Sequence, residues 1–375
     1  MSEYQYYEFQ AIDRPLTREE MANLRSCSSR ARITSNRFTN EYHWGDFKGD
    51  REEWMKRYFD AHLYTSNFGS RIICLRFPIG WIDPDAFIPY QVEGALEVSK
   101  TRTHLILTFL LDKDPGEYDE DEENDSVLSD MLPVRAALAA GDFRALYIGW
   151  LSAVQNGLVA PEAAEPRVPA GLADRDAALD SLVGFLNLRE DLVAAAALNS
   201  PELSASPTST EIGKWLGGIH DKEKDSWLAR LLSGDDPGLR REVLGRFHLA
   251  SGSALRGNDS PRTVDKLISK ADDLETERIR KQRQEATRQE RARIMALVGQ
   301  EAGLWQSVIK LSESSSARYQ ESAVRALKDL RELADMTGGR ADFREKLEGL
   351  IELRRRKSAF MKLMREAGLA RANRR

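Results

Sequence analysis

Cysteine is nearly absent from this chain: Cys27 and Cys74 are the only two among 375 residues. Two cysteines cannot form a zinc site made of four cysteines or the paired CxxC spacing of a zinc finger. They allow one disulfide, but a chain of this length does not need one, and so low a count fits a reducing compartment. We therefore expect a cytoplasmic protein that holds no metal.

Long apolar runs and a targeting segment are also missing. The longest apolar stretches, Leu105–Leu111 and Leu192–Leu198, are far shorter than the ~20 residues that a membrane span needs. Met1–Phe9 is polar and aromatic, and it lacks the basic and apolar regions of a signal peptide. The sequence predicts no membrane association and, with 41% apolar and 31% charged residues, a soluble globular composition.

The common catalytic and nucleotide-binding motifs do not occur. The chain has no GxGxxG, GxxxxGK[ST], HExxH or GxSxG, which excludes the usual nucleotide loops and two large hydrolase classes. A restriction-type nuclease needs Glu-x-Lys on a strand, whereas Glu97 and Lys100 are three apart and would point to opposite faces. The sequence therefore predicts no catalytic residue, no metal ligand and no cofactor. It favours a protein that is not an enzyme and leaves an enzyme open.

One loop has unusual local chemistry. Glu41, His43 and Asp46 lie close together in a segment rich in Gly and Asp, and they could form an acid/base or metal cluster. Such segments are also common turns, in which Trp44 and Phe47 would pack into the core while the carboxylates face solvent. We favour the turn and keep a hydrolase or nuclease at His43 as a third hypothesis.

Aromatic residues are concentrated at the start of the chain, where residues 1–114 hold 18 of the 30. Thr17 and Glu20 are spaced as a capping box that begins a helix, and Arg51–Tyr64 has helical spacing. Alternating or continuous apolar patterns predict strands. The strands are expected at Tyr4–Ile12, Arg32–Tyr42, Arg71–Phe77 and Thr103–Leu111. An α+β domain is therefore predicted over 1–114.

A change of composition follows this domain. Asp112–Asp130 contains ten acidic residues and one lysine, which predicts a solvated acidic linker at 115–130. Short helical patterns bounded by Gly, Pro or Ser then predict an all-α domain over 131–261. The clearest of these patterns are Ala177–Leu198, Glu211–Ile219, Asp221–Leu232 and Pro237–Leu249.

A long charged helix and a basic helical tail are predicted for 262–375. An apolar stripe ends at Leu274 and resumes at Ile294. Between them, Glu275–Arg293 has seven basic and four acidic residues and spans about 28 Å as a helix. No heptad pattern persists through it, so we expect a solvent-exposed helix with i,i+4 charge pairs and not a coiled coil. The fold class is thus an α+β N-terminal domain followed by a predominantly α-helical middle and C-terminal region.

The tail also resembles a known family. A helix is predicted from Ala317 to Gly338, and two more follow it. The segments Tyr319–Ala334, Phe343–Leu353 and Arg356–Met364 resemble the helical tail of bacterial SWIM zinc-finger proteins, and Pro133–Val154 and Phe38–Tyr64 resemble uncharacterised bacterial proteins. Because Cys27 and Cys74 cannot supply that family's zinc motif, the resemblance implies a helical docking tail and no zinc or DNA binding by that motif.

The charge is unevenly distributed along the chain. Residues 264–375 hold 26 basic and 18 acidic residues, so that the net charge of −5 combines a basic end with an acidic remainder. The basic helices offer candidate residues for an anionic partner. These are Arg278, Arg280, Lys281, Arg283, Arg288, Arg291, Arg354, Arg355, Arg356 and Lys357. They could equally be a solvated surface, cations that favour helix C-termini, or partners of the acidic linker.

Two functions rank above the hydrolase or nuclease hypothesis. The first is a non-catalytic interaction or scaffold protein that docks on a protein partner through its helical regions. The second is a nucleic-acid-associated protein of a bacterial DNA-processing or defence complex, which would bind the phosphate backbone through basic helices with salt-sensitive affinity. The identity of the partner and the oligomeric state stay open.

Overall fold

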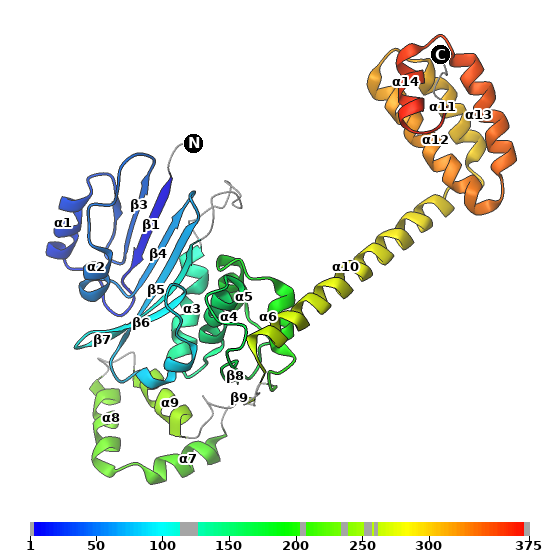
Figure 1. Ribbon diagram of the computed structural model, residues 1–375. Coiled ribbons are helices and arrows are strands. Elements are labelled where there is room, and N and C mark those ends of the chain that lie inside the picture. Colours follow the sequence, from blue (N-terminus) through cyan, green and yellow to red (C-terminus); the bar gives the residue numbers. More distant parts are fainter. Residues whose placement is uncertain are drawn as a thin grey trace. The chain divides into compact units, whose positions relative to one another are not determined.

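The computed structural model describes residues 4–112, 127–202, 208–233, 239–250, 257–258 and 262–370. It divides into two compact units, Met1–Glu275 (unit 1) and Thr276–Arg375 (unit 2). The predicted fold class is confirmed: a sheet domain comes first, and a mostly helical region with one long helix follows (Figure 1). Among the described residues, no helix is long and apolar enough to cross a membrane.

The sheet of unit 1 has seven strands, each antiparallel to its neighbours, in the order β2-β3-β1-β4-β5-β7-β6. The strands are β1 (Gln5–Gln10), β2 (Arg32–Ile33), β3 (Arg37–Tyr42), β4 (Ala61–Ser66), β5 (Ser70–Pro78), β6 (Leu96–Lys100) and β7 (His104–Asp112). Two short 3-10 helices, η1 (Pro84–Ala86) and η2 (Ile88–Tyr90), lie between β5 and β6.

The helix predicted over Arg51–Tyr64 is too long. Helix α2 covers only Arg51–Arg57, and strand β4 begins at Ala61. The apolar residues in this stretch fit a helix by spacing, but β1 and β5 flank β4 and satisfy its backbone groups on both sides. His62 is therefore on a strand, not on a helix as predicted.

Helices cover both faces of the sheet (Figure 1). On one face, α1 (Arg18–Cys27) and α2 pack over an aromatic core that includes Phe9, Phe38 and Trp54. Helix α1 begins with the predicted capping box, in which Thr17 and Glu20 bond each other's backbone N–H groups. This face therefore has the aromatic core that the composition indicated.

The opposite face carries the larger core. It is covered by α3 (Val127–Ala139), α4 (Arg144–Gln155), α5 (Ala177–Phe185) and α6 (Glu190–Ala197). Residues 144–154 of α4 are buried throughout, and at Gly149 an added Cβ would lie 2.9 Å from the Phe109 ring of β7. Helix and sheet thus share one core, so the compact units do not coincide with the predicted domains.

The predicted acidic linker lies almost wholly outside the described residues, which resume at Val127. There α3 begins, so that the last residues assigned to the linker, 127–130, are helical. The linker was expected to separate two domains, but the residues on either side of it contribute to the same hydrophobic core.

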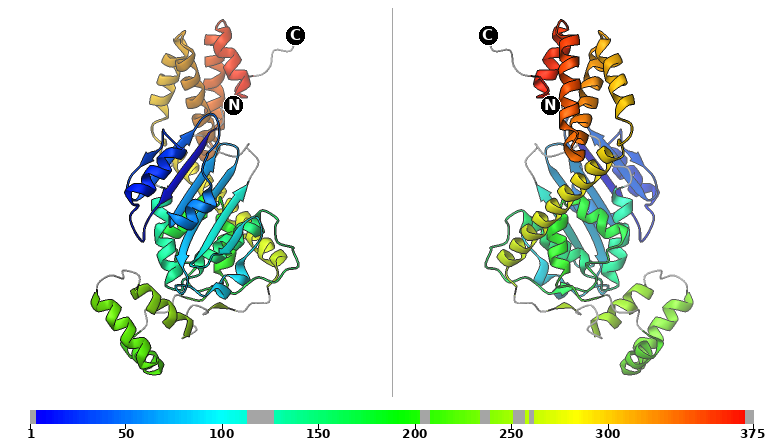
Figure 2. Two further views of the ribbon diagram at one scale, coloured as in Figure 1. Left: turned by 90° about the vertical axis from the view of Figure 1, so that its left-hand side faces the viewer. Right: turned by 90° about the vertical axis from the view of Figure 1, so that its right-hand side faces the viewer.

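A small helical group lies beyond one end of the strands (Figure 1 and Figure 2). It consists of α7 (Ser209–Gly218), α8 (Asp221–Ser233) and α9 (Leu239–Ala250). Trp215 stacks on Trp227 with ring centroids 5.9 Å apart, and Phe247 meets Trp215 edge-on at 5.5 Å. Strands β8 (Val168–Pro169) and β9 (Gly257–Asn258) form a separate two-stranded pair.

Helix α10 (Val264–Met295) begins in unit 1 and continues into unit 2. Unit 2 then contains α11 (Glu301–Glu313), α12 (Ala317–Thr337), α13 (Arg340–Arg354) and α14 (Ser358–Glu366). The prediction for the first tail helix is confirmed, because α12 starts at Ala317 and ends at Gly338, which has a left-handed φ of 81°. Its core includes Trp305, Leu327 and Phe360.

Candidate functional site

Helix α10 is exposed over the stretch that the sequence predicted. Every side chain from Lys281 to Arg293 is exposed, and the whole helix is about 48 Å long. Intrahelical ion pairs support it: Arg280 lies 2.7 Å and Lys281 3.6 Å from Glu277. Such pairs stabilise an isolated helix by about 0.2–0.5 kcal/mol each.

Three arginines of α10 are not used in this way. Arg283, Arg288 and Arg291 make no ion pair with any residue that the structure describes, and all three are exposed. At 100° per residue they share a sector of roughly 140° with Gln284 and Thr287. These five residues line a shallow depression of about 400 Å³ that contains no carboxylate. We call Arg283, Arg288 and Arg291 the arginine face.

The basic run at 354–357 is divided between two roles. Arg354 Nη2 donates to Ile309 O (3.0 Å), and its Nε donates to Ser312 Oγ (3.1 Å). Lys357 donates to the carbonyl oxygens of Glu313 and Ser314. The last four carbonyl groups of a helix lack intrahelical partners, and Lys357 bonds the last of them in α11, that of Glu313. Arg354 bonds the final turns of the same helix, so both cations join the chain at the end of α13 to the end of α11.

The other two members of this run are on the surface. Arg355 pairs with Glu352 at 3.0 Å, and Arg356 is exposed. Arg278, the remaining candidate, is also exposed. The ten candidate residues therefore do not form one basic surface, since some hold the bundle together and others pair along their own helix.

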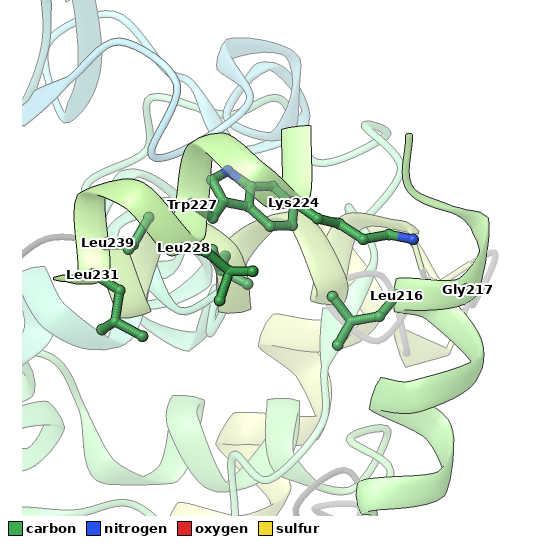
Figure 3. Close-up of a pocket in the computed structure, with 8 residues that line it drawn as sticks. Leu216, Gly217, Lys224, Trp227, Leu228, Leu231 and Leu239 are labelled. Atoms are coloured by element: carbon green, nitrogen blue, oxygen red, sulfur yellow. The ribbon is translucent and has the colours of Figure 1, made fainter. Parts of the chain in front are cut away.

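The group α7–α9 carries an apolar groove that the sequence interpretation missed. The groove has a volume of about 590 Å³. It is lined by Leu216, Gly217, Lys224, Trp227, Leu228, Leu231, Leu239 and Val243. Figure 3 shows these side chains around it, with Lys224 extending toward the end of α7. Among the lining residues that the structure describes, Lys224 alone is charged.

Several leucines of α8 remain in solvent beside this groove. Leu228 is 56% exposed, Leu231 65% and Leu232 85%. The sequence contained a signal for this: Trp227-Leu-Ala-Arg-Leu-Leu232 carries more large apolar residues than one buried face of a short helix requires. Only Trp227 among them is buried, on Trp215 and under Arg246, whose guanidinium lies 5.6 Å from the ring.

The loop around His43 is partly as expected. Phe47 packs on Tyr7, with ring centroids 4.7 Å apart, as the turn interpretation predicted. The same interpretation is wrong for Trp44, which is 81% exposed. His43 is exposed against the ring of Tyr4, and Asp46 accepts a hydrogen bond from Gln5. No group of three or more metal-ligating side chains occurs in the part of the chain that the structure describes.

Comparison with known proteins gives no match: no family model, no curated protein and no solved structure matches the chain. The resemblance of the tail to bacterial SWIM zinc-finger proteins therefore stays a prediction.

Proposed function

We propose that this chain is a non-catalytic interaction protein that docks on a protein partner through its helical regions. The observation that carries the proposal is the apolar groove of α7–α9 with Leu228, Leu231 and Leu232 exposed beside it. Clustered apolar side chains on a surface mark interaction sites, whereas scattered ones need no explanation. Covering one such leucine contributes about 1.5–3 kcal/mol.

The occupant that fits this groove is an amphipathic helix with an acidic residue at the edge of its apolar face. Grooves between helices commonly bind such helices through apolar anchors spaced three or four residues apart. The acidic residue would face Lys224, which is the one charged side chain among the described residues of the lining. Lys224 pairs with Asp221, whose side chain is 91% exposed, and an exposed pair of this kind exchanges partners at little cost.

A photo-crosslinking amino acid at position 228 of the full chain, expressed in the native host, tests this proposal. The expected product joins position 228 to a partner segment with helical apolar spacing and an acidic flank. The purified partner should then bind Leu228→Glu and Leu231→Glu at least about tenfold more weakly than wild type. Leu198→Glu is the matched control, because Leu198 is 62% exposed and outside the groove.

The proposal fails if the cross-linked segment has no such helix, or if the partner binds all three variants with equal affinity. Lys224→Glu tests the acidic flank separately, and it should weaken binding while Lys222→Glu should not. Thermal unfolding of each variant checks that the chain remains folded.

The arginine face supports nucleic-acid association as a second candidate function. Arginines that pair with no carboxylate among the described residues can neutralise phosphates and release counterions. Filter binding of duplex DNA at two salt concentrations tests this. Replacing Arg283, Arg288 and Arg291 by Gln should reduce the salt slope by about 2.7, at about 0.9 for each contact. Absence of binding at low salt would rule the candidate out.

A further inference from the structure

Four polar side chains form a row on the face of the sheet that α1 and α2 partly cover. The strand register pairs Glu97 with Thr108, Thr108 with Cys74, and Cys74 with His62, on β6, β7, β5 and β4. Directly opposite residues of antiparallel strands share a face and lie about 4.5–5.5 Å apart at Cβ. The sequence interpretation could not find this row, because its members are separated by up to 46 positions and two of the strands were not predicted.

The row lies in a cleft beside helix α2. The cleft has a volume of about 260 Å³, and Arg51, Glu52, Met55 and Lys56 of α2 contribute to its wall. Apolar side chains of the sheet complete it. These are Ile72, Val98, Ile106 and Leu110. Cys74 and Thr108 are only half-buried, so α2 leaves this part of the sheet partly open.

His62 has a buried nitrogen that no described residue satisfies. Its Nδ1 donates to Glu8 O at 2.8 Å, since a carbonyl oxygen only accepts, and its ring stacks on Phe9 at 3.9 Å. Burial lowers the pKa of His62 to about 3, so the ring is neutral and Nε2 is an acceptor. Nε2 has no donor among the described residues. A buried acceptor left unpaired costs about 1–3 kcal/mol, which an N–H or O–H group in the cleft would remove.

The centre of the cleft is uncharged. Burial raises the pKa of the Cys74 thiol to about 11, and the Thr108 hydroxyl donates to Cys74 Sγ at 3.6 Å. The thiol is therefore protonated at neutral pH and is not an activated nucleophile. Both groups can hydrogen-bond a ligand, so the cleft has the character of a binding site and not of a covalent catalytic centre.

Charges of opposite sign lie at the margin of the cleft. Arg51 makes no ion pair with any residue that the structure describes; its guanidinium lies 5.3 Å from the centroid of the Tyr64 ring. Glu97 is exposed and accepts one backbone hydrogen bond, from Gly94 N at 2.9 Å. Glu52 and Lys56 of the cleft wall pair with each other at 3.3 Å. The cleft thus offers the guanidinium of Arg51, a buried acceptor and an aliphatic floor within a volume smaller than that of most drug-sized sites.

We propose that this cleft binds an apolar α-amino acid. The carboxylate of the ligand pairs with Arg51, its ammonium group donates to His62 Nε2, and its side chain packs on Ile72 and Leu110. Arg51 has no carboxylate partner and His62 Nε2 has no donor among the described residues, and an α-amino acid supplies both a carboxylate and an N–H donor. A larger ligand such as a nucleotide would extend beyond the cleft. This inference does not depend on the proposed protein partner.

Calorimetric titration of the full chain with L-leucine, L-methionine and L-phenylalanine tests the inference. At least one should bind. Two analogues of that ligand then test its carboxylate contact and its ammonium contact separately. The amide removes the carboxylate and the N-acetyl derivative removes the ammonium charge, so each should bind about tenfold more weakly or worse. The proposal is overturned if none of the three amino acids binds, or if AMP binds and they do not.

Two variants of α2 form a matched pair for the same titration. Arg51→Gln should weaken binding at least about tenfold, whereas Arg57→Gln, also on α2 but outside the cleft, should leave it unchanged. Unchanged affinity in Arg51→Gln would overturn the proposed carboxylate contact. Both side chains lie at the surface, so neither substitution is expected to unfold the chain.

Cysteine alkylation gives an independent measurement on the unaltered protein. The bound amino acid should slow the reaction of Cys74 with N-ethylmaleimide and should not affect Cys27, which is outside the cleft. Equal protection of both cysteines would indicate general stabilisation and would contradict binding at this place.

Discussion

Arginine has different roles in the two units. Unit 1 has 46 acidic and 31 basic residues. Its buried arginines Arg76, Arg135 and Arg144 donate a hydrogen bond from every guanidinium nitrogen. Unit 2 has 14 acidic and 24 basic residues, and its arginine face has no carboxylate partner among the described residues. In the acidic unit arginine joins distant parts of the chain, whereas in the basic unit part of the arginine surplus remains available to a partner.

Arg76 illustrates the first role. Its guanidinium lies 2.6 Å from Asp60 and donates to the carbonyl oxygens of Met55 and Lys56 at 3.0 and 3.1 Å. Arg262 is similar, because it pairs with the buried Glu165 at 2.6 Å, and Glu165 also accepts a hydrogen bond from Tyr147. These contacts connect strands, helices and loops that are far apart in the sequence.

The largest expected effect on the free energy of unfolding comes from removing the carboxylate that pairs with a buried arginine. Asp60→Asn leaves the charge of Arg76 buried without a counter-ion, and it also replaces the acceptor of two backbone N–H groups, those of Ile12 and Asp13. We expect a loss of about 3–5 kcal/mol in the free energy of unfolding, measured with urea. Asp46→Asn, at an exposed carboxylate, is the control, and a loss below about 1 kcal/mol at Asp60 would contradict this role.

A smaller effect is expected in unit 2, where one arginine resembles those of unit 1. Arg354→Ala removes the donors that bond Ile309 O and Ser312 Oγ in the final turns of α11, so the unfolding free energy should fall by about 1–2 kcal/mol. Arg355→Ala, next in sequence, removes only an exposed pair with Glu352 and should cost less than about 0.5 kcal/mol. Equal losses in the two variants would show that Arg354 does not stabilise the end of α11.

Arg14 of unit 1 is intermediate between the buried, paired arginines and the arginine face, since it is half-exposed but pairs with Glu20. Its hydrogen bonds, together with that from Thr17 N–H, lower the pKa of Glu20 to about 2. The unfolded value is about 4.3, so the stabilisation is present above that pH and is lost as the pH falls toward 2. At pH 5 the unfolding free energy of the wild type should exceed that of Glu20→Gln by about 1 kcal/mol, and at pH 2 this difference should disappear. A difference that persists at pH 2 would contradict the assignment.

The smallest expected effect on stability is at the arginine face. Replacing Arg283, Arg288 and Arg291 by Gln should change the unfolding free energy by less than about 0.5 kcal/mol, because no described group loses an ion pair. Thermal unfolding measures this. A loss above about 1 kcal/mol would mean that these arginines stabilise the fold, and the contrast with unit 1 would no longer hold.

Local sequence patterns predicted the elements that depend on local interactions. The capping box at Thr17 and the end of α12 at Gly338 are confirmed, and α10 is a continuous exposed helix because little in its sequence interrupts one. Strand β4 was missed, since its structure depends on pairing with β1 and β5 and not on its own residue spacing.

The candidate site was harder to predict for the same reason. Arg354 and Lys357 look like surface cations in the sequence, and only the position of the α11 C-terminus reveals their role. The cleft at His62 depends on the register of four strands, which spacing along the chain does not contain. The exposed leucines of α8 are the exception, because their excess over the needs of one helix face was visible in the sequence.

The exposed stretch of α10 also has a consequence for local unfolding. From Lys281 to Arg293 every side chain is exposed, so helix–coil equilibrium and not tertiary packing sets the stability of these turns. Their amide hydrogens should exchange with solvent much faster than those of α4, although both segments contribute helical signal to circular dichroism. A protease that cleaves after arginine should therefore cut this stretch of α10 faster than it cuts at the buried Arg144 of α4, and the cut would release the bundle α11–α14 with its core intact.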